Sequence, residues 1–281
     1  TEWHRNGWQR SEGRQYMKLS AITIYPIKST KGISLKSASV APRGLEHDRR
    51  WMLIDQQNQF ITARAFPQLL QVEVSISNRE LQLKAPEMAT QHLPIHPAEE
   101  NEIEVIIWRD ACKALTINQE INQWFSRYLG VPCRLVYLPD SSHRPVDAHF
   151  GAPGDEVSLA DGFPLLVISE SSLEDLNRRA SEPLVMRRFR PNLEISGSGA
   201  YEEDQWHRVT IGNVEFEAVK PCSRCIITTI DPETGVKSHN GEPLRTLSSY
   251  RKTDDKVFFG MNLIPRSSGL IYLDDPVVPL L

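Results

Sequence analysis

The residues with the clearest capacity for chemistry are two cysteines separated by two positions. Cys222 and Cys225 lie in the sequence KPCSRCIITT, residues 220–229. A CxxC pair has three common roles, and the surrounding sequence helps to separate them. A zinc site needs two further ligands at short spacing, whereas the other cysteines, Cys112 and Cys133, are isolated. The sequence therefore gives little support to structural zinc.

The other interpretations of the pair differ in the reactivity of the thiols. A thioredoxin-type redox pair opens a helix, whose positive end lowers the thiol pKa, but residues 226–230 are β-branched and predict a strand. A single reactive cysteine on a loop that enters a strand is the second interpretation, with Arg224 and also Lys220 favouring the thiolate. Two buried structural cysteines are the third, and these residues alone leave it open.

Basic residues gather at turn-like positions, not along helix faces. They form three clusters, which lie at residues 28–32, 48–50 and 187–192. Arginine matches phosphate with a bidentate fork, and lysine supplies a point charge. A single cluster is usually a solvated loop, but three clusters in a chain of net charge −4 favour a small ligand that carries phosphate.

Short apolar runs broken by 19 prolines and 15 glycines favour strands over long helices. Alternation and β-branched content predict strands at residues 18–28, 51–54, 60–62, 72–76, 81–83, 103–108, 134–138, 163–168, 209–211, 214–216, 226–230 and 270–273. Helical spacing predicts one amphipathic helix that is capped by Thr116 and ends at Gly130, and a capping box of Ser171 and Glu174 predicts another.

The stretch from residue 139 to residue 162 has no periodicity, and loops of this length are usually functional or disordered. We place a domain junction near its start. The predicted fold is mostly β (α+β), with two β-barrel-like modules at residues 17–138 and 139–281 and a cleft between them. Residues 1–16 are polar and patternless, and we expect them to be a disordered leader or an added extension.

Composition argues against a nucleic-acid partner, a membrane span, a signal peptide and a disulfide scaffold. The net charge of −4 and the pI near 6.1 argue against a nucleic-acid partner. No run approaches the ~20 apolar residues of a membrane span, and the first sixteen residues lack the apolar region of a signal peptide. Four cysteines are too few for a disulfide scaffold, so we expect a cytoplasmic protein.

Taken together, several segments resemble the MOSC family of molybdenum-cofactor proteins. The similarity is strongest to the mitochondrial amidoxime-reducing components and the bacterial YcbX-like proteins, and it extends in order from Met17 over nearly the whole chain. CSRCIxTTxDPxTG is its most specific motif. The matching segments are YPIKSTKG at 25–32, LEHDRRW at 45–51, FPLLVISESSLEDLN at 163–177, FRPN at 189–192, CSRCIITTIDPETG at 222–235 and FGMNLI at 259–264.

The resemblance implies a MOSC-associated N-terminal β-barrel domain, a MOSC domain and a molybdopterin cofactor between them. By position, Cys225 is the molybdenum ligand and the catalytic centre. A soft thiolate suits a thiophilic metal, and basic residues would neutralise the cofactor's phosphate. The implied cofactor contacts are Lys28, Ser29, Arg49, Ser169, Ser171, Arg190, Asn192 and Arg224.

The implied activity is reduction of N-hydroxylated compounds, such as N-hydroxylated nucleobases and amidoximes. The alternative is a protein without turnover, which binds the cofactor or carries sulfur as a persulfide on Cys225. About one molybdenum per chain would favour the enzyme. No general acid is assigned; Asp161 and His149 on the long loop are the candidates, and a surface role is the default expectation for each.

Reduction also needs a source of electrons. Many YcbX-like proteins continue into a two-iron ferredoxin domain, but this sequence has no C-x₄-C-x₂-C pattern. It has no G-x-G-x-x-G fingerprint for a flavin or nicotinamide either. We therefore expect a separate donor, such as a ferredoxin with its flavoprotein reductase, or a ferredoxin domain that is missing from this chain.

Overall fold

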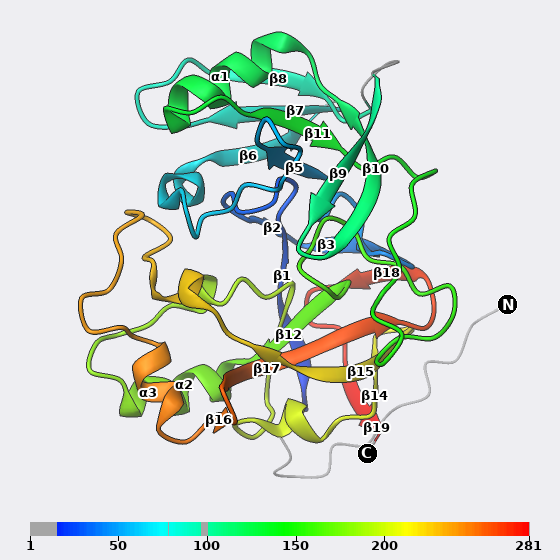
Figure 1. Ribbon diagram of the computed structural model, residues 1–281. Helices are drawn as coiled ribbons and strands as arrows, with labels where there is room; N and C mark the ends of the chain where they lie inside the picture. Colours follow the sequence, from blue (N-terminus) through cyan, green and yellow to red (C-terminus); the bar gives the residue numbers. More distant parts are fainter. Residues whose placement is uncertain (1–15, 78, 97–100, 281) are drawn as a thin grey trace, which may run out of the picture.

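A computed structural model describes residues 16–77, 79–96 and 101–280 of the chain (Figure 1). The leader predicted at residues 1–16 lies outside these ranges except for Tyr16. The fold is mostly β, as predicted, with its strands in four sheets among the described residues. In Figure 1, α1 and the sheets around it lie at the top, and the long strands β15 and β17 lie in the lower half.

The largest sheet has strands from both ends of the chain. Its order is β19-β14-β15-β17-β12-β13-β1-β2, with β16 paired to β17. Its neighbouring strands are antiparallel except β12 and β13, which run parallel. The strands are β1 (Lys18–Ile24), β2 (Ile33–Leu35), β12 (Leu165–Ser169), β13 (Leu193–Ser196), β14 (Arg208–Ile211), β15 (Val214–Ser223), β16 (Lys252–Thr253), β17 (Lys256–Pro265) and β19 (Val277–Leu280).

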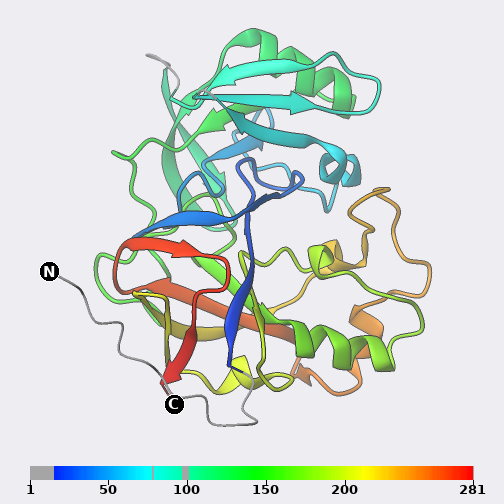
Figure 2. The same ribbon diagram turned by 180° about the vertical axis from the view of Figure 1, so that it is seen from behind.

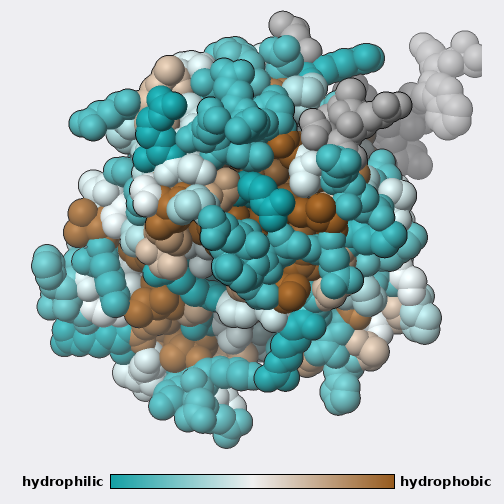
Figure 3. Space-filling view, turned by 45° about the horizontal axis from the view of Figure 1, so that its top comes forward, coloured by the Kyte–Doolittle hydropathy of each residue, from teal (hydrophilic) through white to brown (hydrophobic). Residues whose placement is uncertain are grey.

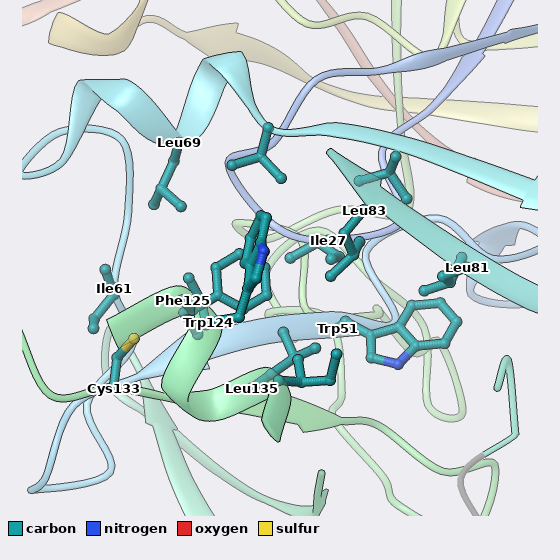
Figure 4. Close-up of a cluster of buried hydrophobic side chains, with 14 of the residues drawn as sticks. Ile27, Trp51, Ile61, Leu69, Leu81, Leu83, Trp124, Phe125, Cys133 and Leu135 are labelled. Atoms are coloured by element: carbon teal, nitrogen blue, oxygen red, sulfur yellow. The ribbon is translucent and has the colours of Figure 1, made fainter. Parts of the chain in front are cut away.

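Two smaller sheets make up most of the N-terminal half. One has the order β5-β11-β10-β9 and the other β6-β7-β8. Alternating apolar side chains of these strands pack with α1 (Gln119–Leu129) into a core that includes Trp51, Phe125 and Cys133 (Figure 4). The strands are β5 (Trp51–Ile54), β6 (Glu73–Ser77), β7 (Glu80–Lys84), β8 (Gln91–Pro94), β9 (Glu102–Ile107), β10 (Asp110–Thr116) and β11 (Arg134–Tyr137).

Strands of one half pair with strands of the other half. Near the C-terminus, β18 (Gly269–Tyr272) pairs with β3 (Ser37–Ala41), which in turn pairs with β4 (Gly44–Leu45). Figure 2 shows β18 in red beside β3 in blue. Since β1 also pairs with β13, strands of the predicted module at residues 17–138 are bonded to strands of the other. The boundary between residues 138 and 139 remains a prediction.

Both predicted helices form, but their caps differ from the predicted ones. Thr116 pairs with Val136 as the last residue of β10, so Asn118 takes the cap position of α1 and its side chain accepts from the backbone N–H of Ile121. The second helix, α2 (Glu170–Arg179), is capped by Ser169 and not by Ser171. A third, α3 (Leu244–Ser248), is short.

The segment after the cysteine pair is a 3-10 helix, η4 (Ile226–Thr229), and the predicted strand at residues 226–230 is wrong. The hydroxyls of Thr228 and Thr229 donate to carbonyls three residues earlier, which stabilises a tight turn. Three further 3-10 helices occur in the described residues, η1 (Pro67–Gln71), η2 (Met186–Arg188) and η3 (Glu202–Gln205).

Several other strands agree with the predictions apart from their bounds, whereas β8, β17 and β19 were not predicted. The hairpin across Gly212 is confirmed as β14 and β15, with Gly212 at φ 57°. Phe60 makes only a single bridge to Ile54, so the strand predicted at 60–62 does not form. Strand β10 was missed because its polar residues hide the alternation. The loop at residues 139–162 contains neither a helix nor a strand.

Seen from the side of the N-terminal half, hydrophilic side chains cover most of the surface, and apolar ones form separate patches between them (Figure 3). Within the described residues, no helix has both the length and the apolar character needed to cross a bilayer.

Candidate functional site

A cleft of about 430 Å³ lies where loops of both halves meet. This volume falls in the usual range of small-molecule sites, roughly 300–1,000 Å³. The N-terminal half contributes the loop after β1 and the turns before β5 and β10, and the C-terminal half contributes the ends of β15 and β17. The lining includes Lys28, Ser29, Arg49, Arg64, Trp108, Asp161, Phe163, Phe189, Arg190, Asn192, Cys222, Arg224, Cys225, Lys256 and Asn262.

Four residues of the lining have a left-handed backbone although none is glycine. They are Ser29, Arg49, Trp108 and Arg190, with φ of 73°, 47°, 56° and 57°. Such conformations cost free energy for residues with a Cβ, and they gather at ligand sites where the surrounding fold holds them. Their concentration here marks the cleft as a built site.

Two arginines of the cleft hold one tyrosine ring between them. The guanidinium carbons of Arg49 and Arg190 lie 4.2 and 4.1 Å from the ring centroid of Tyr25. Arg190 also donates to the carbonyl of Thr30 at 2.7 Å. Burial lowers the pKa of Arg190 to about 10, so it stays charged at neutral pH, and burial raises the pKa of Tyr25 to about 12. Tyr25 therefore positions two cations in the cleft wall.

Asn192 and Asp48 fix Arg49 from its other sides. Arg49 donates to the Asp48 carboxylate at 2.6 Å and to the side-chain oxygen of Asn192 at 3.0 Å. The Asn192 amide donates in turn to the carbonyl of Thr23 in β1. Because Asn192 precedes β13, this network joins the two halves of the molecule at the cleft.

Lys28 is buried and paired with a carboxylate of the long loop. Its Nζ lies 2.6 Å from Asp161 Oδ1 and donates to the carbonyl of Leu159 at 2.9 Å. Burial lowers the pKa of Lys28. Burial alone would raise the pKa of Asp161, but Lys28 and Arg64 outweigh it and hold that pKa below its usual range. Asp161 is therefore ionised at neutral pH, which argues against a role as the general acid.

The cation beside Cys225 is Arg64, which the sequence did not single out. Cys225 is half-buried at the cap of η4, and Arg64 Nη2 lies 3.3 Å from its sulfur. Arg64 precedes η1 in a stretch with no other basic residue, so only the tertiary fold reveals its place. A guanidinium at this distance offers the sulfur a charge-assisted contact.

Cys222 lies in the same wall but makes different contacts. Arg224 Nη1 donates to the Cys222 sulfur at 2.9 Å, and Arg224 Nη2 donates to the carbonyl of Phe189 at 2.5 Å. Both cysteines of the pair line the cleft and neither is fully buried, so two buried structural cysteines are not what the fold contains. Cys222 belongs to β15 and does not open a helix, which argues against a thioredoxin-type pair.

The lining has a surplus of positive charge. Six of its residues are Lys or Arg and two are Asp, in a chain of net charge −4. Among the described residues, Arg190 and Arg224 have no carboxylate partner, and the buried Nε atoms of Arg64 and Arg224 have no hydrogen-bond partner. Half-buried cations without carboxylate partners fit an anionic ligand that supplies the missing acceptors.

The cleft gathers most of the residues that the sequence analysis selected. Lys28, Ser29, Arg49, Arg190, Asn192, Arg224 and Cys225 all line it.

Ser169 and Ser171 do not line the cleft. The Ser169 hydroxyl bonds to Glu203 and Ser172 at the start of α2, so their role as cofactor contacts stays a prediction without support from the cleft. Lys220 lies over the ring of Phe150 at 4.1 Å, and not beside Cys225. His149 is exposed and lies outside the lining.

Within the described residues, no group of three or more His, Cys, Asp or Glu could hold a metal ion. A metal beside Cys225 would therefore take one ligand from the protein there and its others from the group that carries it.

Comparisons with known proteins agree with the two-part organisation. Residues 16–132 match the MOSC N-terminal beta barrel domain, and residues 154–278 match the MOSC domain. The mitochondrial amidoxime-reducing component 1 of Mus musculus is 35% identical over 294 residues, which cover 96% of this chain and 86% of that protein. The human protein of the same name is 34% identical over 301 residues, with 97% and 87% covered.

Among solved structures, the YuaD protein from Bacillus subtilis aligns over 94% of this chain and 96% of that one. Its TM-score is 0.41 and its identity 9%, which is too remote to support an inference.

Proposed function

Because the chain belongs to the MOSC family, with a MOSC N-terminal β-barrel domain followed by a MOSC domain, we propose that it is a molybdenum-cofactor-dependent reductase of N-hydroxylated compounds. One observation carries the proposal. The half-buried Cys225 lines a cleft whose other walls include Arg190 and Arg224, two half-buried cations that have no carboxylate partner among the described residues. The relatives are named for the reduction of amidoximes, which are one class of N-hydroxylated compound.

The residues of the cleft fit a molybdopterin. Cys225 would be the metal ligand, and its sulfur already accepts from a guanidinium, as ligand sulfurs of metal centres often do. Lys28, Arg49 and Arg190 would hold the phosphate and the pterin, together with Ser29, Asn192 and Arg224. The Nε of Arg224, buried without a partner, supports this fit because a buried donor normally has an acceptor.

The reaction we propose is R–NHOH + 2 e⁻ + 2 H⁺ → R–NH₂ + H₂O. The bound cofactor supplies the two-electron chemistry. The chain's own residues orient the substrate and set the charge around it. Asp161, ionised beside Lys28 and Arg64, is an acceptor for the N–H groups of an amidoxime or an N-hydroxylated base and not a proton donor.

The two electrons would come from a separate protein, such as a ferredoxin with its flavoprotein reductase. Such an encounter is steered by surface charge and slows at high salt. Nucleic acid has no place in the proposal, and the cytoplasm remains the predicted compartment.

The test is reduction of benzamidoxime or N⁶-hydroxyadenine by molybdenum-loaded protein under anaerobic conditions. With reduced viologen, or with ferredoxin and its reductase, we expect the amidine or amine as product. With NADH or NADPH alone we expect none. If loaded protein reduces no N-hydroxylated compound, the proposal fails, and a persulfide on Cys225 of metal-free protein would then support a sulfur carrier.

A further inference from the structure

Trp108 is an aromatic residue of the cleft at a position where it adds little to the stability of the fold. Trp108 lies in the two-residue turn between β9 and β10, since Ile107 and Asp110 on either side are paired. It has φ of 56°, lines the cleft and remains 44% exposed. Tight turns with left-handed backbone favour Gly, Asn or Asp. A tryptophan in this conformation costs backbone free energy, and a side chain that stays exposed gains little burial to offset it.

The contacts of Trp108 hold its ring in one orientation. The guanidinium carbon of Arg64 lies 4.2 Å from the ring centroid, and the ring of Phe60 lies 4.7 Å away at an interplanar angle of 61°. The remaining indole surface faces solvent in the cleft. A ring fixed on two sides and open on another is a ready stacking platform.

Trp108 is also close to the site of the proposed reaction. The same Arg64 that contacts its ring lies 3.3 Å from the Cys225 sulfur. The Asp161 carboxylate, whose side chain is 59% exposed, lines the same cleft, and the Trp108 side chain helps to lower its pKa. A flat molecule on the indole would therefore have an acceptor for its N–H groups at one edge and the reacting centre within reach.

We propose that Trp108 determines the substrate class of this site, by stacking a flat conjugated ring next to the N-hydroxyl group while Asp161 accepts from the adjoining amino group. This inference rests on the proposed function and deepens it. Aromatic amidoximes and N-hydroxylated nucleobases are preferred over aliphatic amidoximes that offer the same reacting group without a ring.

The experiment compares benzamidoxime with acetamidoxime, which share the reacting group and differ in the ring. The variants are Trp108→Phe, which keeps an aromatic face, and Trp108→Leu, which keeps apolar volume only. Stacking on an aromatic side chain is worth roughly tenfold or more in affinity. We expect wild type to favour benzamidoxime by about that factor in KM, Trp108→Phe to keep most of the preference and Trp108→Leu to lose it.

A second readout does not depend on turnover. Calorimetric titration of the protein with each amidoxime measures the preference for the ring directly, whether or not the cofactor is loaded. Tyr272→Leu is the matched control, because Tyr272 is a similarly exposed aromatic residue, 49% accessible, on β18 outside the cleft lining. It should keep the wild-type preference.

The inference is overturned if wild type binds both amidoximes equally, or if folded Trp108→Leu, checked by circular dichroism, binds benzamidoxime with the wild-type preference. If calorimetry shows a preference for the ring that depends on Trp108 but no amidoxime is reduced, the stacking role stands and the proposed function fails.

Discussion

The core of the N-terminal half and the cleft bury side chains of opposite kinds. In the core, Phe125 of α1 belongs to one apolar cluster with Trp51 and Leu135, and the cluster also includes one cysteine, Cys133 (Figure 4). In the cleft, Lys28 is buried and Arg190 is half-buried, although burial lowers the pKa of both. Apolar burial stabilises a fold by itself, whereas charge burial does so only with a partner.

This difference indicates what each region is for. The core explains why the N-terminal sheets stay together, and nothing in it requires a ligand. Burying charged groups in the cleft lowers the stability of the fold as long as no ligand balances their charge, as is common at active sites. Substitutions that separate stability from cofactor binding test this interpretation.

The largest effect should come from exchanging the cysteine of each region for alanine. Cys225→Ala should lower the rate of N-hydroxyl reduction by orders of magnitude and leave the midpoint of thermal unfolding nearly unchanged, because the residue is half-buried at the cleft. Cys133→Ala should cost about 1–2 kcal/mol of stability through a cavity in the core and leave the rate of the folded enzyme unchanged.

Cys222→Ala is the control within the cleft, since its sulfur contacts Arg224 and not Arg64. We expect it to keep a substantial part of both activity and molybdenum content. Equal loss in Cys222→Ala and Cys225→Ala would show that both sulfurs hold the metal.

A smaller effect, of opposite sign in the two measurements, is expected for Arg190→Met. A charge-assisted contact to phosphate is worth roughly 1.5–3 kcal/mol, so the pterin content, measured after its oxidation to a fluorescent product, should fall. Cofactor-free Arg190→Met should unfold at the same temperature as wild type or higher, because a buried cation is removed.

Arg208→Met is the matched control for Arg190→Met. Arg208 is exposed on β14 and pairs with Glu215 at 2.8 Å, and surface pairs contribute little. Neither measurement should change. A cofactor-free Arg190→Met that is clearly less stable than wild type would mean that Arg190 serves the fold and not a ligand.

The smallest effect is expected at Glu194, a carboxyl whose protonated, neutral form is favoured by burial. Burial, and next the charge of Glu170, raise the pKa of Glu194 on β13 to about 7. A raised pKa in the folded state stabilises the protein below the unfolded pKa, and this contribution is lost as pH rises towards 7 and beyond. Between pH 5 and pH 8, Glu194→Gln should therefore gain stability relative to wild type, on the order of 1–2 kcal/mol after allowance for partial exposure.

Urea unfolding at a series of pH values measures this gain, and Glu104→Gln on the exposed face of β9 is the control. A difference between Glu194→Gln and wild type that does not vary with pH would show that Glu194 is ionised in the fold throughout this range.

The same contrast explains what could be predicted from the sequence. The hairpin of β6 and β7 and the buried strand β12 follow from local periodicity, which burial on one or both faces imposes. The strand predicted after Cys225 failed because β-branched residues favour strands on average, whereas the hydroxyls of Thr228 and Thr229 bond to the backbone of their own turn.

The candidate site was predicted in part. Motif similarity found Cys225, Arg49 and Arg190, but it could not find Arg64 or Trp108. Arg64 reaches Cys225 across 161 positions of the chain, and no local pattern records such a contact. The left-handed backbone of Trp108 is likewise invisible in a sequence where the turn carries none of the usual turn residues.

The pairing of strands from the two halves also affects when the protein can bind its cofactor. Strand β1 pairs with β13 and strand β3 pairs with β18, so neither sheet is complete until the later strand has been synthesised. The cleft needs residues as far apart as Lys28 and Asn262, so its walls cannot close around a ligand while the ribosome is still making the second half. Contacts of such long sequence separation slow folding. We therefore expect the cofactor to enter a finished chain.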